Sequence, residues 1–139
     1  MAQILFIDPD LTALHGHLRQ AKALGHVPIG ATAGMRGIEE LSRNPGVSLI
    51  VSELDLPDGS FEQLFQAVRT SEHYAQVPFL VLSGVVESTR MLRLIARGVE
   101  YAAKKPITED ELRFLLGRAL KCFADRAQAW GEYPEAMVG

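Results

Sequence analysis

Short apolar runs alternate with amphipathic stretches along most of this chain. Five runs have the length and composition of β-strands, at residues 3–7, 27–31, 48–52, 77–82 and 101–103. The stretches that follow them repeat apolar residues at spacings of three and four, the pattern of helices packed on a surface. Strands that alternate with helices predict right-handed crossovers and a parallel sheet covered on both faces. The expected fold class is therefore α/β, a doubly wound sheet of five strands with five helices.

A proline in the second apolar run indicates where that strand lies in the sheet. Pro28 cannot donate to a central hydrogen-bond ladder, so residues 27–31 are expected at an edge. Of the two common doubly wound orders, the flavodoxin-like order 2-1-3-4-5 places the second strand at an edge. In such sheets the functional site lies beyond the carboxyl ends of the strands. The residues that end or follow each strand are therefore the candidates for chemistry.

The predicted helices have recognisable starts and buried faces. Ser60 and Thr108 each begin a capping-box pattern, with Gln or Glu three residues later. In the second helix, Met35, Ile38 and Leu41 fall on one face, which is expected to be buried. The fifth helix is expected to pack through an apolar stripe made of Leu112, Leu115, Leu116, Ala119 and Phe123.

Length and composition limit the remaining possibilities. The 139 residues suit one domain, expected over 1–124, with a helix extension and a tail or linker over 125–139. The roles of Trp130 and Tyr133 in that last segment stay open. A net charge of −3 argues against nucleic-acid or membrane binding. The single cysteine, Cys122, excludes an intrachain disulfide, and with no secretory signal or apolar span in the sequence it predicts a cytoplasmic protein.

Polar side chains lie at or just beyond the ends of four predicted strands. In chain order these residues are Asp8, Glu53, Ser83 and Lys105. The carboxyl ends of parallel strands meet at one edge of the sheet, so we expect these side chains to converge. Carboxylates suit a hard cation such as Mg²⁺, a lysine neutralises phosphoryl oxygens, and a hydroxyl donates a hydrogen bond. The set is typical of a site for a divalent cation and a phosphoryl group.

Four short segments at these positions resemble a known family. They are Ile4-Leu5-Phe6-Ile7-Asp8, Leu56-Pro57-Asp58-Gly59, Val81-Leu82-Ser83-Gly84 and Lys105-Pro106. In this order and spacing, over about residues 1–123, the chain resembles the receiver domain of bacterial two-component response regulators. The resemblance implies that Lys105 is the phosphate-sensing lysine, before a cis proline at Pro106. It also implies that Ser83 is the switch hydroxyl and that Asp8 belongs to the acidic pair near the metal.

The family's phosphoacceptor aspartate is replaced in this chain. In the family a Leu or Met and then a Pro follow the acceptor by three and four positions, and counting back from Leu56-Pro57 gives Glu53. The extra methylene carries the carboxylate roughly 1.5 Å further, a displacement to which in-line phosphoryl transfer is sensitive. The longer side chain can present its charge to Lys105 and Ser83, as a phosphomimic does. A plainer interpretation also stays open, in which Glu53 is a tolerated substitution and Lys105 an ion-pair partner in a vestigial pocket.

A second departure weakens the expected metal site. The family normally has a second acidic residue where this chain has Pro9, which offers no ligand. Asp10 lies one position too late, and we expect it to cap the first helix. Mg²⁺ would then have Asp8, Glu53 and the backbone carbonyl of Asp55. We therefore expect no cofactor, or Mg²⁺ bound weakly.

The expected docking face differs from the family pattern as well. Counting back from Lys105 places Ala102 where receivers usually carry an aromatic residue, while Tyr101 should point to the opposite side of the strand. A fourth helix, expected over residues 87–97, carries a basic stripe that is either solvated or binds a partner. The resemblance implies that this helix, the last strand and the last helix form the docking face. The candidate interaction residues are Arg90, Arg93, Arg97, Tyr101 and Ala102.

These features favour a pseudo-receiver, a phosphorylation-independent interaction module of two-component (phosphorelay) signalling without enzymatic activity. The expected partners are signalling proteins such as a histidine kinase or an output protein, and a homodimer is compatible with the sequence. One alternative is an atypical phosphoacceptor that a histidine kinase modifies on Glu53 or Asp55. Another is a small-molecule binder that uses the same cleft. Against it, the first strand ends in Asp8-Pro9-Asp10 instead of a glycine-rich phosphate loop.

Overall fold

The computed structural model describes the backbone of residues 1–58, 61–84 and 88–138 and the side chains of residues 1–58, 61–84 and 89–129. Within these ranges the strands are β1 (Gln3–Ile7), β2 (Val27–Ala31), β3 (Val47–Glu53), β4 (Phe79–Ser83) and β5 (Tyr101–Lys104). The helices are α1 (Leu11–Ala23), α2 (Gly34–Arg43), α3 (Phe61–Thr70), α4 (Ser88–Ala96) and α5 (Glu109–Val138). None of these helices has the length and apolar character needed to cross a membrane.

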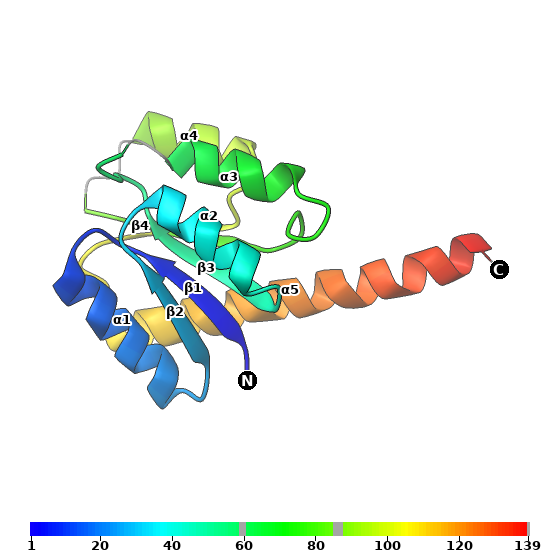
Figure 1. The fold of residues 1–139 in the computed structure, drawn as a ribbon, viewed down its shortest axis with the longest axis horizontal. Coiled ribbons are helices and arrows are strands. Elements are labelled where there is room, and N and C mark those ends of the chain that lie inside the picture. The colour runs from blue at the N-terminus through cyan, green and yellow to red at the C-terminus, as the bar shows by residue number, and fades with distance from the viewer. Residues whose placement is uncertain (59–60, 85–87, 139) are drawn as a thin grey trace.

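The five strands form one parallel sheet in the order β2-β1-β3-β4-β5. The predicted fold class and strand order are thus confirmed. Pro28 lies in the edge strand β2, as its missing N–H requires. Helices cover both faces, with α1 and α5 on one side and α2, α3 and α4 on the other (Figure 1). The carboxyl ends of the strands meet at the edge where the predicted site residues lie.

Each face of the sheet has its own hydrophobic core, because side chains alternate along a strand. Ile4 and Phe6 of β1 join the core under α1 and α5, whereas Leu5 and Ile7 join the core under α2, α3 and α4. All of the described side chains of β3 and β4 are buried. Burial on both faces holds the ends of β3 and β4 in place, and these ends carry two of the predicted site residues.

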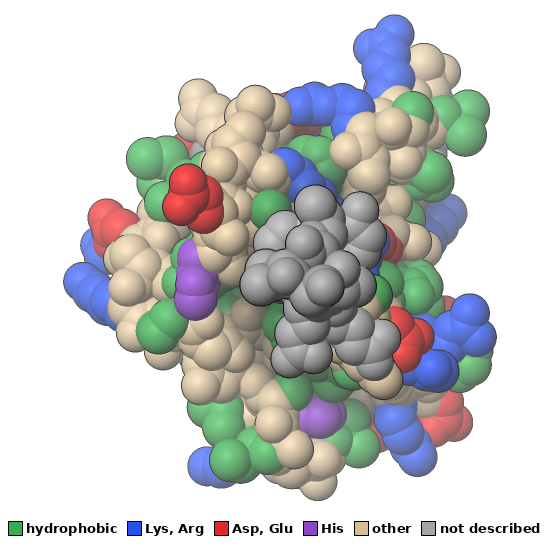
Figure 2. Space-filling view, turned by 90° about the vertical axis from the view of Figure 1, so that its right-hand side faces the viewer, with side chains coloured by type: hydrophobic (Ala, Val, Ile, Leu, Met, Phe, Trp, Pro, Cys, Tyr) green, Lys and Arg blue, Asp and Glu red, His purple; other side chains and the backbone are tan. Residues whose placement is uncertain are grey.

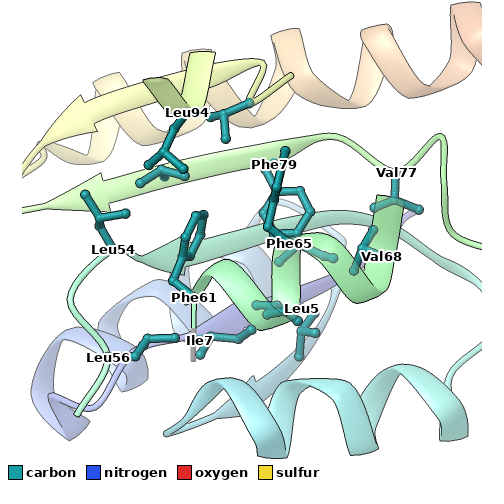
Figure 3. Close-up of a cluster of buried hydrophobic side chains, with 14 of the residues drawn as sticks. Leu5, Ile7, Leu54, Leu56, Phe61, Phe65, Val68, Val77, Phe79 and Leu94 are labelled. Atoms are coloured by element: carbon teal, nitrogen blue, oxygen red, sulfur yellow. The ribbon is translucent and has the colours of Figure 1, made fainter. Parts of the chain in front are cut away.

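An aromatic cluster packs α3, the helix that follows the β3–α3 loop, against β4. The ring centroids of Phe61 and Phe65 lie 6.0 and 5.1 Å from that of Phe79 in β4, both edge-on (Figure 3). The guanidinium of Arg69 lies 4.9 Å from the centroid of Phe65, within the range of a cation–π contact. The first turn of α3 is therefore fixed against the sheet. Its predicted cap residue, Ser60, lies outside the described residues.

The packing of α2 corrects one expectation. Met35, expected on the buried face, is 52% exposed, while Leu41 is buried and Ile38 partly so. Gly37 faces the sheet instead, and a Cβ at this position would lie 2.5 Å from Cδ1 of Ile7. The close approach of helix and strand turns Met35 towards solvent. The spacing of three and four identified Ile38 and Leu41 correctly, but it did not predict that a glycine would contact the sheet.

The ends of β4 and α5 can be compared with the prediction. β4 begins at Phe79 and not at Val77, because Pro78 cannot donate to the ladder. α5 begins at the predicted cap, since the Thr108 hydroxyl accepts from the N–H of Glu111 at 3.1 Å. The helix then continues to Val138, so the stretch predicted as a tail or linker after the helix extension has helical backbone.

A buried carboxylate ties α5 to the amino-terminal end of the sheet. Glu100 accepts hydrogen bonds from Arg69 at 2.7 Å and from the N–H of Phe79 at 2.8 Å, and Arg126 of α5 lies 2.8 Å from it. The Glu100 side chain is 10% exposed, so these partners compensate a charge that water scarcely reaches. Figure 2 views this end of the molecule, where apolar, acidic and basic side chains are interspersed over the visible surface.

Candidate functional site

Lys105 lies between two buried carboxylates at the carboxyl edge of the sheet. Its Nζ donates to Oδ2 of Asp8 and lies 2.7 Å from Oε2 of Glu53. The side chains of Asp8 and Glu53 are 4% and 9% exposed, and that of Lys105 is 19% exposed. The structure therefore brings three of the four predicted strand-end side chains into direct contact. We call these three residues the Lys105 site.

Backbone hydrogen bonds position each member of the Lys105 site. The N–H of Asp8 donates to the carbonyl of Ala31 in β2 at 3.0 Å. Oε1 of Glu53 accepts from the N–H of Asp55 at 3.2 Å, which leaves Oε2 for the lysine. The N–H of Lys105 donates to the carbonyl of Ser83 at 2.8 Å. The ammonium group of Lys105 thus links the carboxyl ends of β1, β3 and β5.

The next peptide bond, Lys105–Pro106, is cis, as the resemblance implies. Ser83 is fully buried as the last residue of β4. Pro106 and Ser83 thus lie beside the Lys105 site, at the strand ends where the sequence predicts them.

The charge of Lys105 is stabilised by its neighbours. Burial by itself would lower the pKa of Lys105, but the hydrogen bonds and charges of Asp8 and Glu53 outweigh it, so the pKa is raised above its ordinary value. The lysine therefore carries its charge at neutral pH. Two of its three donors are already directed at carboxylate oxygens, so an incoming anion would have to compete with both carboxylates.

The acidic residues of the site suit Mg²⁺ poorly. Asp8 and Glu53 both pair with Lys105, and Pro9 supplies no oxygen from its side chain. Asp10 caps α1, as predicted, by accepting from the N–H groups of Thr12 at 3.0 Å and Ala13 at 3.4 Å. No three His, Cys, Asp or Glu side chains in the described part of the chain form a group that could hold a metal ion. Lys105 therefore pairs with both acidic side chains that the resemblance assigns to the neighbourhood of the metal.

His17 lies next to the Lys105 site, where sequence reasoning assigned it no special place. It lines a cleft of about 570 Å³ between α1 and the β5–α5 loop, together with Lys105 and Pro106. Burial lowers the pKa of His17, the charge of Asp8 opposes this shift, and the charge of Lys105 adds to it. The spacing of three from Leu14, on the buried face of α1, was the available signal. A small molecule that used the strand-end cleft would contact this histidine.

The predicted basic stripe of α4 is interrupted by ion pairs. Arg90 lies 2.8 Å from Oδ1 of Asp55 and 2.9 Å from Oε1 of Glu62 in α3. The guanidinium of Arg97, just beyond α4, lies 5.7 Å from the centroid of the Phe65 ring. Both arginines therefore engage the α3 side of the molecule. Tertiary contacts thus direct two of the three arginines of the stripe towards α3.

The remaining predicted interaction residues lie on opposite sides of β5. Tyr101 packs on the core under α1 and α5, and its hydroxyl donates to the carbonyl of Arg118 at 3.4 Å. Ala102 is exposed on the other side, as strand alternation predicts. On the neighbouring α4, Leu92 and Ile95 are 66% and 50% exposed. This surface thus combines exposed apolar side chains with Arg93, which makes no ion pair among the described residues.

The chain is similar in sequence to curated response regulators. It is 28% identical over 89 residues to two-component response regulator ORR5 of Oryza sativa subsp. japonica, across 64% of this chain and 66% of that protein. It is 27% identical over 88 residues to two-component response regulator ORR11 of Oryza sativa subsp. indica, across 63% of this chain and 60% of that protein. These matches span somewhat less than two thirds of the relatives' own length.

The hybrid signal transduction histidine kinase D of Dictyostelium discoideum is also similar, with 27% identity over 109 residues. That match covers 78% of this chain and 7% of the kinase. No protein-family model matches the chain.

Solved structures share the fold at low sequence identity. A CheY-like response regulator receiver domain protein from Methanospirillum hungatei JF-1 superposes with a TM-score of 0.82 at 16% identity, over 91% of this chain and 98% of that one. The chemotaxis response regulator CheY4 of Vibrio cholerae gives 0.79 at 20% identity, over 86% and 98%. At such identities the likeness shows the fold, and the curated relatives supply the sequence link. Fold and sequence therefore point the same way: the chain shares the fold of solved receiver-domain structures and is similar in sequence to two-component response regulators.

Proposed function

We propose that the chain is a two-component signalling module whose output does not depend on phosphorylation. Its curated relatives are named as response regulators and a hybrid histidine kinase, and its proposed partners are signalling proteins of these kinds. The observation that carries the proposal is the contact of 2.7 Å between Glu53 and Lys105. The lysine that would sense a phosphoryl group is thereby already paired with a carboxylate of the chain itself.

In this proposal Glu53 takes the place of the phosphoacceptor. It is the last residue of β3 and precedes Leu56 and Pro57 by three and four positions. A phosphorylated aspartate would present negative charge to Lys105, and the longer glutamate side chain presents a carboxylate to the same ammonium group permanently. The site is therefore held near one state without a phosphoryl group.

The proposal requires no magnesium. Phosphoryl transfer in receivers depends on a cation held by acidic side chains, and here Pro9 replaces one ligand while Lys105 occupies the remaining carboxylates. Mg²⁺ would have to displace the lysine from both Asp8 and Glu53. We therefore expect weak binding of the ion and no catalytic self-phosphorylation.

The proposed contact surface lies on α4, β5 and α5. Leu92 and Ile95 present apolar area beside the cation of Arg93, and Ala102 leaves the adjacent strand without a large side chain. Phe114 of α5 is 63% exposed. Exposed apolar side chains flanked by charge are typical of protein-binding surfaces. Output through protein contact is consistent with this surface.

Intact-mass analysis after incubation with acetyl phosphate and excess Mg²⁺ tests the proposal. A conventional receiver serves as the positive control and should gain the mass of a phosphoryl group, while this chain should gain none. A hydroxylamine-labile adduct that maps to Glu53 or Asp55 would overturn the proposal. It would instead establish the alternative of an atypical phosphoacceptor.

Two variants distinguish the effect of Glu53 on phosphorylation from the effect of Pro9. Glu53→Asp alone should stay unmodified, because Pro9 still withholds a metal ligand. Glu53→Asp combined with Pro9→Asp should gain Mg²⁺-dependent phosphorylation. If the single change gives full phosphorylation, our account of Pro9 is wrong, although Glu53 would still explain why the natural chain is inert.

A further inference from the structure

Arg90 joins three separate parts of the chain. Its side chain leaves α4 and reaches Asp55, in the loop after β3, with Nη1 at 2.8 Å. Its Nη2 donates to Glu62, in the first turn of α3, at 2.9 Å. A planar guanidinium suits such a double contact, because its donors are held in a fixed fork. We call this arrangement the Arg90 fork.

The Asp55 arm of the fork continues into the Lys105 site. Leu54 and Leu56 on either side of Asp55 point into the core with Leu94 of α4 (Figure 3). The carboxylate of Asp55 is turned outward and meets Arg90, while its N–H donates to Glu53 at 3.2 Å. Glu53 in turn pairs with Lys105, so an unbroken series of polar contacts runs from the strand-end site to α4.

Apart from the fork, α4 is held lightly. The helix has nine residues, and its buried side chains in the described range are Met91 and Leu94. A helix this short is not stable without tertiary contacts, so each contact weighs heavily on whether it stays docked. Leu92 and Ile95 face solvent. Among the described side chains of α4, residues 89–96, the fork is therefore the main polar link to the body of the domain.

We infer that the Arg90 fork is a tether that couples the side chain at position 53 to the docking of α4. When Glu53 is paired with Lys105, the loop at Asp55 is held in place and the fork keeps α4 against α3. A change at position 53 that loosens this loop weakens the fork and lets α4 open. The inference goes beyond the proposed function, since the tether requires no phosphorylation and is tested without it.

Amide hydrogen exchange in α4 measures the tether directly. Arg90→Met keeps the apolar stem and removes the fork, and we expect exchange over residues 91–96 to become on the order of tenfold faster. Arg93→Met is the matched control on the same helix, with expected exchange within twofold of the natural chain. Amides of α2 serve as the internal reference for global stability. If Arg90→Met leaves α4 exchange within twofold as well, there is no tether.

The coupling to position 53 needs a second comparison. Glu53→Gln removes the ion pair with Lys105 and should speed exchange in α4 in the natural background. In the Arg90→Met background it should change α4 exchange little, because the link is already broken. Equal acceleration in both backgrounds would overturn the inference. Asp55→Asn, at an exposed side chain, removes only the arm that leads to position 53, so it should speed α4 exchange less than Arg90→Met and should also abolish the effect of Glu53→Gln; the test then does not rest on variants of the buried site alone.

Discussion

The charge of Lys105 is expected to hold the carboxyl edge of the sheet together. Lys105→Met keeps a long apolar side chain but removes the cation between Asp8 and Glu53. Both carboxylates would remain buried, with 4% and 9% of their side chains exposed, and without the cation that compensates their charge. We therefore expect the folded state to lose stability relative to the unfolded state, in which water solvates both carboxylates.

The magnitude follows from burial. Removing one partner of a buried ion pair costs about 3–5 kcal/mol, because the other partner is left as an uncompensated charge. Lys105 is itself 19% exposed, so some water reaches the site and reduces this cost. We expect a loss of about 2–4 kcal/mol in the free energy of unfolding. That is a large part of the about 5–15 kcal/mol that stabilises a typical domain.

Urea unfolding at neutral pH measures this loss. With a slope of about 1–3 kcal/mol per molar urea, the midpoint should fall by roughly 1–2 M. Lys104→Met is the matched control, because Lys104 is exposed and forms no ion pair among the described residues, and it should stay within about 0.5 kcal/mol. The contribution of Lys105 is fully present below about pH 10.4 and is lost as the pH rises through the raised pKa in the folded chain.

A second substitution, Glu53→Gln, is expected to change stability in opposite directions in two backgrounds. Glu53→Gln should destabilise the natural chain, because it breaks the pair with Lys105. In the Lys105→Met background it should stabilise the chain, because it removes one of two uncompensated carboxylates. A loss below about 1 kcal/mol for Lys105→Met, or destabilisation by Glu53→Gln in both backgrounds, would refute the reasoning.

Three further predictions concern other parts of the fold. Because burial lowers the pKa of His17, the unfolded chain binds protons more readily below about pH 6.5, so the natural chain should lose stability relative to His17→Gln as the pH falls from 7 to 5. Parallel stability curves would contradict this. Arg69→Met removes a donor from buried Glu100 and should cost about 2–4 kcal/mol in urea unfolding. Gly37→Ala places a methyl group 2.5 Å from a core atom and should cost about 1–3 kcal/mol, whereas Gly16→Ala, with open space around it, should not destabilise.

Much of the architecture could be predicted because it depends on local patterns. The apolar runs identified all five strands, with ends that match or differ by at most two residues, and Pro28 indicated the edge strand. The caps at Asp10 and Thr108 were also predictable, since a cap depends on side chains within three residues of the helix start. Met35 was predicted wrongly, because periodicity does not reveal that Gly37 brings α2 close to Ile7.

For the candidate site, the sequence by itself determined which residues end the strands and which edge of the sheet they share. Asp8, Glu53 and Lys105 meet because parallel strands align their carboxyl ends, whatever the details of packing. The pairs formed by long side chains were decided by the tertiary structure. Arg90 reaches acids 35 and 28 residues away, and its periodicity on α4 predicted neither contact, since it indicated a face that is either solvated or binds a partner. Periodicity records which side of an element is apolar, but the partner of a flexible charged side chain depends on which other elements packing brings within its reach.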